Sequence, residues 1–236
     1  TSCKLILVGD IEQLPPVKLG RPFECIMKCG LFNTNKLDEI KRQDDGTLKD
    51  CILDLKNNKL SIDNFDGDTA RFIEHDFKNN NETSEIFTKI IQEFGKENIT
   101  VISPEHDKHG GVYEMNKMLQ IICNPDEEIR HSIFKHGDYV IRTENDYTQD
   151  IIRVNGDTGT IHFDKNIKNS KSYRTDNRAV IHYDDDSEFI KNSEFIDYDN
   201  LYDTFALNYC CTVHKFQGSQ KKVIVFICSS SHSSLL

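Results

Sequence analysis

Short continuous runs of apolar residues alternate with amphipathic segments along much of the chain. Three partly β-branched runs lie at 5–8, 98–103 and 223–228. Such runs are typical of parallel strands that are covered on both faces. Apolar residues at helical spacing predict helices at 48–55, 85–94 and 112–122, whose apolar stripes serve core packing. The pattern therefore predicts an α/β fold built on a parallel sheet.

Residues 134–198 follow a different pattern, in which short β-rich runs are separated by polar turns. The runs lie at 137–142, 159–163, 178–183 and 188–190. Their regular spacing, with turns of the Asn155-Gly156 type, predicts a small antiparallel β-barrel. Because apolar runs resume afterwards, we expect this barrel to be an insertion. The interrupted parallel sheet should then join 99–103, 205–211 and 223–228.

Neither the acidic turns nor the cysteines predict a metal site. Three adjacent aspartates begin at Asp184, but neighbouring carboxylates cannot all face one ion, so a solvated turn is the better interpretation. The eight cysteines form no C-x-x-C pattern, although Cys25 lies near Cys29 and Cys210 is followed by Cys211. Reduced, buried thiols indicate a soluble intracellular protein of the cytoplasm or nucleus.

The composition is that of a globular protein, with 37% hydrophobic and 29% charged residues in a chain of 236. No apolar run approaches the roughly 18 residues of a membrane helix, and no signal peptide is visible. The formal net charge of −10 argues against a protein that coats DNA through bulk positive charge, but not against a local groove for one strand. A buried strand at 5–8 needs neighbours, so we expect a piece of a longer polypeptide or a truncated one.

The first apolar run leads into Gly-Asp-Ile-Glu-Gln-Leu-Pro-Pro-Val at 9–17. Ligands of parallel sheets lie beyond the carboxyl ends of the strands, which places Asp10, Glu12 and Gln13 where a nucleotide would bind. Taken alone, glycine and aspartate before a proline turn are ordinary. The whole run resembles motif III of superfamily-one helicases of the RecD-like branch, and Gly-Arg-Pro-Phe at 20–23 fits the same family.

In that family the glutamine of the motif senses the terminal phosphate of ATP and couples nucleotide state to single-stranded DNA. The resemblance implies a catalytic role for Gln13, with Gly9 and Asp10 beside the nucleotide. Residues 37–43, Leu-Asp-Glu-Ile-Lys-Arg-Gln, resemble the segment with the motif IV arginine, which implies that Arg42 is an arginine finger. A guanidinium there would stabilise the charge on the transferred phosphoryl group. The alternative is a solvated charge pair.

Residues 212–220, Thr-Val-His-Lys-Phe-Gln-Gly-Ser-Gln, strongly resemble motif V of the same family. We expect Thr212 to cap the helix that follows. The resemblance implies DNA contacts for four residues and nucleotide contacts for two others, namely Thr212, His214, Lys215 and Gln217 on DNA, and Gly218 and Gln220 on the nucleotide. Gln220 stands where the family usually has glutamate, so its hold on the nucleotide sugar lacks a charge. For any one residue, a capped core helix is the alternative.

Residues 101–125 also resemble the second motor domain of RecD-like helicases. This implies that Ser103 contacts the nucleic-acid backbone, while plain strand–helix architecture is an equal alternative.

Gly-Asp at 137–138 and Asn-Gly-Asp-Thr-Gly at 155–159 match a small Src-homology-three-like β-barrel inserted in that domain. We expect the barrel to lie near the DNA exit, where Tyr139, Arg142 and Tyr147 could stack on or pair with a strand. For Tyr139, a place in the barrel core is the favoured alternative.

The resemblance implies four parts. Residues 1–35 end a first RecA-like motor domain, 36–133 begin a second one, 134–198 form the inserted barrel, and 199–236 continue the second motor domain. The sequence contains no Gly-x-x-x-x-Gly-Lys-Ser/Thr loop, and the acidic magnesium motif and the last arginine motif of the family are absent too.

The implied activity is that of part of an ATP-dependent helicase that moves 5′ to 3′ on single-stranded DNA, as in DNA repair, recombination or replication. Its cofactors would be ATP and Mg²⁺, with the magnesium ligands mostly outside this segment. Its partners would be single-stranded DNA and the rest of the helicase chain, with no membrane, and the segment alone should be inactive. The alternatives are a degenerate, non-catalytic clamp or scaffold and a viral-type RNA helicase.

Overall fold

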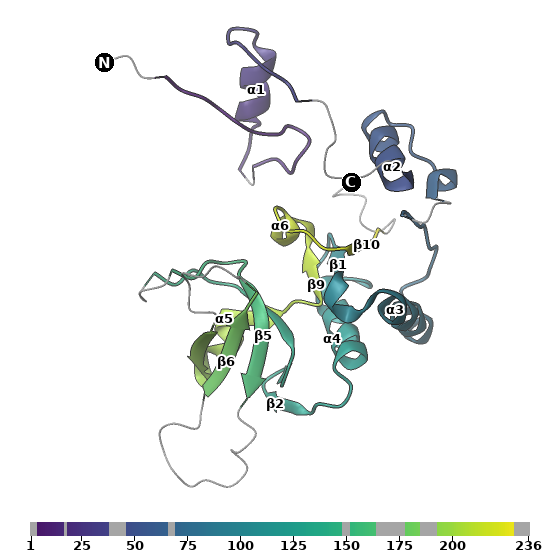
Figure 1. Ribbon diagram of the computed structural model, residues 1–236, viewed down its shortest axis with the longest axis vertical. Coiled ribbons are helices and arrows are strands. Elements are labelled where there is room, and N and C mark those ends of the chain that lie inside the picture. Colours follow the sequence, from purple (N-terminus) through teal and green to yellow (C-terminus); the bar gives the residue numbers. More distant parts are fainter. Residues whose placement is uncertain are drawn as a thin grey trace. The chain divides into compact units, whose positions relative to one another are not determined.

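The structure, a computed structural model, describes residues 4–16, 18–37, 46–65, 69–147, 152–163, 178–184 and 193–228 (Figure 1). Its contacts divide the chain into two compact units, Thr1–His75 and Asp76–Leu236. None of the described helices is long and apolar enough to cross a membrane.

The first unit contains short helices and a small core. Helix α1 (Pro22–Lys28) starts with proline, which suits a first helical turn because no N–H is needed there. Helix α2 (Thr47–Lys56) buries Cys51 against the 3-10 helix η1 (Ile62–Phe65). The Cys51 thiol donates a hydrogen bond to the carbonyl oxygen of Asn64, which joins these two elements.

The predicted buried strand at 5–8 is not formed in this structure. The side chains of Leu5, Ile6 and Val8 are 80%, 83% and 93% exposed, and the segment has no strand pairing within the described residues. A lone strand is not stable, because its N–H and C=O groups need a hydrogen-bonded neighbour. The apolar pattern is therefore present, but no described segment supplies the partner.

A three-stranded parallel sheet forms the centre of the second unit. Its strands are β1 (Ile99–Ser103), β9 (Cys210–Thr212) and β10 (Val223–Phe226), in the order β10-β1-β9. In register, Ile99 pairs with Val223 and Ser103 pairs with Thr212. Because the strands are parallel, Ser103 and Thr212 both lie at the carboxyl edge, where such sheets place ligands.

Helices α3 (Asn80–Phe94) and α4 (Val112–Cys123) pack on this sheet. Asn79 caps α3 by accepting a hydrogen bond from the N–H of Glu82. Gly95, with φ of 82°, ends the helix in the left-handed conformation that glycine favours, and the 3-10 helix η2 (Lys96–Asn98) leads into β1. The shared core comprises Phe87, Val101, Val112, Met115, Leu119, Cys210 and Ile227.

A separate antiparallel sheet of five strands lies between β1 and β9 in the sequence. It comprises β4 (Tyr139–Arg142), β5 (Thr158–Phe163), β6 (Arg178–Tyr183), β7 (Ser193–Asp197) and β8 (Phe205–Leu207), in the order β7-β6-β5-β4-β8. Alternate residues of β5 are buried, as expected for a strand with one covered face.

A two-stranded hairpin and a helix accompany this antiparallel sheet. The hairpin consists of β2 (Ile129–His131) and β3 (Phe134–Lys135), and helix α5 (Tyr198–Thr204) connects β7 to β8. The core of this region includes Phe134, Val140, Ile161, Ile181, Leu201 and Phe205.

The inserted antiparallel structure agrees with the prediction, but its sheet does not close into the predicted barrel. Strands β7 and β8 are the two edges of the sheet, and no pairing joins them among the described residues. The predicted strand at 188–190 lies outside the described residues. Because the pattern of alternation is the same for an open and a closed sheet, it could not predict closure.

The predicted strand at 205–211 is divided between the two sheets. Its first part is β8, which pairs antiparallel with β4, and its last residues belong to β9, which pairs parallel with β1. The change takes place at Asn208 and Tyr209, where the N–H of Asn208 donates to the carbonyl oxygen of Tyr139. The predicted parallel sheet of three strands is thus formed, with a shorter middle segment.

Candidate functional site

The motif III-like loop of the first unit is a turn organised by Asp10. One carboxylate oxygen of Asp10 accepts from the N–H of Glu12 at 3.0 Å, and the other accepts from the side-chain amide of Gln13 at 3.2 Å. Aspartate commonly closes turns in this way. Gln13 itself is exposed at the tip of the turn. The predicted polar residues therefore form one local unit, in which Asp10 orients Gln13.

Gly9 is fixed at its position by close packing. A Cβ atom built on Gly9 would lie 3.0 Å from the ring of Phe23, closer than ordinary van der Waals contact. The two parts of the sequence that resemble the helicase motif, 9–17 and 20–23, are thus packed against each other. Glu12 also forms an ion pair of 2.5 Å with Lys56 of α2, although both side chains are about half exposed. Exposed pairs contribute little stability.

The second predicted catalytic residue, Arg42, lies outside the described residues. The structure therefore brings Gln13 together with Gly9 and Asp10, and it gives no arrangement of Gln13 with Arg42.

At the carboxyl edge of the parallel sheet, Ser103 ends β1 and Thr212 ends β9. Ser103 is fully buried, and its hydroxyl accepts a hydrogen bond of 3.5 Å from the N–H of Glu105. As it lies, Ser103 supports the turn after β1. Thr212 is half-buried and accepts a hydrogen bond of 3.3 Å from the N–H of Lys215, so it caps helix α6 (Val213–Phe216) as predicted.

The rest of the motif V-like segment continues from this capped turn to the surface. His214, Gln217, Gly218 and Gln220 are exposed, whereas Lys215 is half-buried. Partial burial lowers the pKa of the Lys215 ammonium, because it loses water contacts. Gly218 has φ of 88°, a conformation that favours glycine. Four of the five predicted DNA-contacting residues therefore lie on one short segment at the edge of the parallel sheet, whereas the fifth, Ser103, is buried at the end of β1.

Sequence reasoning missed a residue just after this segment. The Lys221 ammonium lies 5.3 Å from the centre of the Tyr139 ring and donates to the carbonyl oxygen of Glu97. The Tyr139 hydroxyl donates to Asp184 at 2.7 Å, and its ring is half-buried. Burial raises the pKa of Tyr139, so the hydroxyl stays protonated. Tyr139 thus lies at the margin of the inserted sheet between Asp184 and Lys221, and not in its core as the favoured alternative predicted.

The expectation that Arg142 contacts DNA is wrong for this structure. Arg142 is only 4% exposed, and its guanidinium donates to Glu194 at 2.7 Å and to the Tyr183 hydroxyl at 3.1 Å. A buried charge needs a partner of opposite charge, and Glu194 is 52 positions away in the sequence, so local patterns could not reveal the pair. Tyr147, in contrast, is exposed, with its hydroxyl accepting from Asn145.

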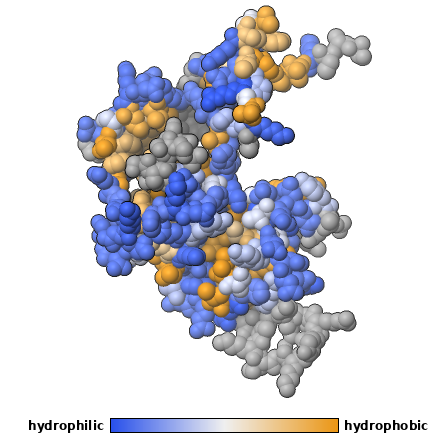
Figure 2. Space-filling view, turned by 180° about the vertical axis from the view of Figure 1, so that it is seen from behind, coloured by the Kyte–Doolittle hydropathy of each residue, from blue (hydrophilic) through white to orange (hydrophobic). Residues whose placement is uncertain are grey.

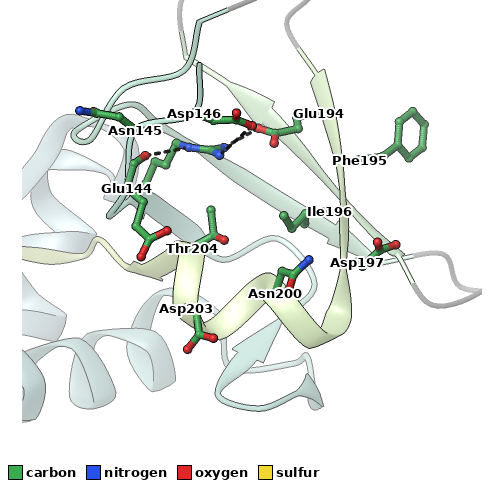
Figure 3. Close-up of a pocket in the computed structure, with 11 residues that line it drawn as sticks. Glu144, Asn145, Asp146, Glu194, Phe195, Ile196, Asp197, Asn200, Asp203 and Thr204 are labelled. Carbon is green, nitrogen blue, oxygen red and sulfur yellow. Dashed lines mark hydrogen bonds and ion pairs between the residues drawn. The ribbon is translucent and has the colours of Figure 1, made fainter. Parts of the chain in front are cut away.

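Arg142 lies at a pocket of about 740 Å³ whose other charged residues are all acidic (Figure 3). The acidic lining residues are Glu144, Asp146, Glu194, Asp197 and Asp203. Carboxylates repel a phosphate backbone, so this face of the inserted sheet does not suit nucleic acid. Within the described residues, no group of three or more histidine, cysteine, aspartate or glutamate side chains is arranged to hold a metal ion.

Comparison with known proteins agrees with the motifs. Residues 1–73 match the family of AAA domains, a match that ends near the boundary between the two units. The ATP-dependent RecD2 DNA helicase of Deinococcus radiodurans is 24% identical to this chain, over 100% of the chain and 30% of the helicase. The chain therefore spans about 30% of the length of this relative. The resemblance to RecD-like helicases that the motifs indicated is confirmed over the whole chain.

Proposed function

We propose that this chain is part of an ATP-dependent DNA helicase that couples ATP hydrolysis to 5′-to-3′ movement on single-stranded DNA. The observation that carries the proposal is the capped segment 212–218 at the carboxyl edge of the parallel sheet, in a chain similar to a DNA helicase throughout. This edge is where α/β sheets place ligands.

For DNA, the proposed contacts are Thr212, His214, Lys215 and Gln217, with Ser103 supporting the neighbouring turn. Lys215 supplies a positive charge, and the exposed polar side chains supply hydrogen bonds to phosphate. A chain with a net charge of −10 cannot attract DNA as a whole, so binding depends on such a local segment.

For the nucleotide, the proposed contacts are Gly9, Asp10 and Gln13 of the first unit and Gly218 and Gln220 of the second, with Arg42 as the arginine finger. Gln13 can donate its amide to a terminal phosphate. Asp10 uses both carboxylate oxygens to hold its own turn, so it does not fit a magnesium ligand as it lies. We therefore expect the Mg²⁺ ligands to come from elsewhere in the polypeptide.

The proposed protein partner is the rest of the helicase chain. Apolar side chains lie exposed in the first unit, including Leu5, Ile6, Val8, Leu19 and Leu31, and Figure 2 shows apolar residues at the surface beside the grey N-terminal residues. Exposed apolar patches of this kind mark surfaces that another element covers. This supports a first motor domain that is completed by further polypeptide.

The test uses the complete polypeptide and measures ATP turnover with and without single-stranded DNA, and unwinding of duplexes with a 5′ or a 3′ tail. We expect DNA-stimulated turnover and unwinding from the 5′ tail.

Gln13→Ala should leave DNA binding nearly intact and uncouple ATP turnover from unwinding. Arg42→Ala should lower kcat roughly 10³-fold, as removal of arginine fingers does in related phosphoryl transfers.

The outcomes separate the competing functions. DNA binding without ATP turnover would identify a non-catalytic clamp, and stimulation by RNA alone would identify an RNA helicase. Normal turnover by the Arg42→Ala enzyme would remove Arg42 from the site.

A further inference from the structure

Asp138 is a fully buried carboxylate at which separate segments of the second unit meet. One oxygen accepts from the side-chain amide of Asn124 at 2.8 Å and from the Tyr209 hydroxyl at 3.0 Å. The other accepts from the N–H of Lys135 at 2.7 Å and from the side-chain amide of Gln120. A buried charge is costly unless hydrogen bonds satisfy it, and here four donors do so. These donors are therefore held firmly around the carboxylate.

The four donors come from three parts of the fold. Gln120 lies on α4 and Asn124 caps its C-terminus, Lys135 lies on β3, and Tyr209 lies between β8 and β9. Burial, and then the charge and hydrogen bond of Asp138, raise the pKa of Tyr209, so this tyrosine remains a hydrogen-bond donor. Asp138 thus ties the inserted region to α4 and to the point where the chain returns to the parallel sheet.

Helix α4 also forms hydrogen bonds with Cys210, the residue that follows Tyr209. The side chain of Asn116 donates to the carbonyl oxygen of Cys210 at 2.8 Å and accepts from its N–H at 2.9 Å. Both residues are buried. Tyr209 and Cys210 are therefore both fixed relative to α4, the first through Asp138 and the second directly.

The motif V-like segment begins immediately after these two fixed residues. Strand β9 is only three residues long, and its last residue, Thr212, caps α6. Only Cys210 and Cys211 separate Tyr209 from Thr212.

We propose that Asp138 is a positioning residue, which acts through Tyr209 to set where segment 212–218 lies relative to the inserted sheet. The inference rests on the proposed function, because it concerns the segment assigned to DNA contact. Asp138 itself is buried and touches no substrate.

The test compares two tyrosine variants in the complete polypeptide. Tyr209→Phe removes the hydroxyl that donates to Asp138. Tyr183→Phe is the matched control, because its hydroxyl also donates to a buried carboxylate, that of Glu194, but within the inserted sheet alone. Two readouts are taken from each variant: amide hydrogen exchange of residues 210–218, and the dependence of ATP turnover on the concentration of single-stranded DNA.

For Tyr209→Phe we expect faster amide hydrogen exchange at residues 210–218. We also expect an increase of about fivefold in the DNA concentration that gives half-maximal stimulation, the amount that one hydrogen bond accounts for. The kcat at saturating DNA should be unchanged. Tyr183→Phe should change amide hydrogen exchange only within the inserted sheet. It should leave the dependence of ATP turnover on DNA concentration unchanged. Asp138→Asn, which removes more than one hydrogen bond, should give a larger effect in the same direction.

Equal effects of Tyr209→Phe and Tyr183→Phe on both readouts would overturn the proposal, whether or not Asp138→Asn folds. A fall in kcat with an unchanged DNA dependence would also overturn it. If the unmodified polypeptide shows no DNA-stimulated turnover, the proposed function fails, and the exchange of 210–218 alone then decides whether Asp138 positions this segment.

Discussion

Arg142 illustrates, at the scale of a single residue, how a buried charge depends on its partner. Its ion pair with Glu194 is almost fully enclosed, with both side chains about 5% exposed. Arg142→Met leaves the Glu194 carboxylate buried without its cation, so we expect the free energy of unfolding to fall by about 3–5 kcal/mol in denaturant titrations. Arg178→Met is the control, because its pair with Asp197 is half exposed and should contribute less than about 1 kcal/mol. Equal losses in the two variants would contradict this interpretation.

His162 makes stability depend on pH. Its ring meets those of His136 and His182 edge to face, with ring centres 5.0 and 4.6 Å away. Burial, and then the charges of His182 and His136, lower the pKa of His162. The unfolded chain, with a histidine pKa near 6.5, therefore binds the proton more readily than the folded one. The contribution to stability is complete above about pH 6.5 and is lost as pH falls toward and through the lowered pKa.

We therefore expect the free energy of unfolding to decrease as pH falls below about 6.5, and His162→Gln to flatten this dependence. Urea titrations at a series of pH values measure it. His214→Gln, which changes an exposed histidine, serves as the comparison. An unchanged pH dependence in His162→Gln would show that other groups cause it.

At the scale of elements, the cap of α6 determines how well the motif V-like segment is ordered. Thr212→Ala removes the acceptor for the N–H of Lys215, which should cost about 1 kcal/mol and increase hydrogen exchange across 213–218. Thr212→Ser keeps the hydroxyl and should behave like the unmodified chain. Similar exchange in the alanine and serine variants would show that the cap does not hold this helix.

The elements that the sequence predicts well are those decided by nearby residues. The cap at Thr212, the helices α3 and α4, and the strands β1 and β10 depend on local patterns, and all are formed. The division of 205–211 was not predictable, because it depends on a hydrogen bond from Asn208 to the distant residue Tyr139.

The candidate site follows the same rule. The turn around Gln13 depends on Asp10, three residues away, whereas the partner of Arg142 lies 52 positions along the chain. For the same reason, the role of Asp138 was not predictable beyond its place in the barrel-like motif at 137–138, because its donors are brought together only by the packing of α4, β3 and Tyr209.

At the scale of the whole molecule, we expect the isolated 236-residue chain not to hydrolyse ATP. Its sequence contains no Gly-x-x-x-x-Gly-Lys-Ser/Thr loop to cradle the phosphates, so neither their positioning nor the neutralisation of their charge is available. Steady-state phosphate release by the purified chain, with single-stranded DNA present, measures this. Turnover that stays with the chain through successive purification steps would contradict the expectation.

The hydrogen bonds between the Asn116 side chain and the backbone of Cys210 join residues that are 94 positions apart. This separation affects the order in which the elements fold. Closing so long a loop lowers the conformational entropy of the chain before any stabilising contact has formed. The antiparallel strands β4 to β7 pair in sequence order, and their assembly shortens the effective loop. We therefore expect the antiparallel sheet to form first and to nucleate the pairing of β1 with β9. In stopped-flow measurements, Ile161→Val in the antiparallel sheet should slow folding, whereas Val101→Ala in the parallel sheet should mainly accelerate unfolding.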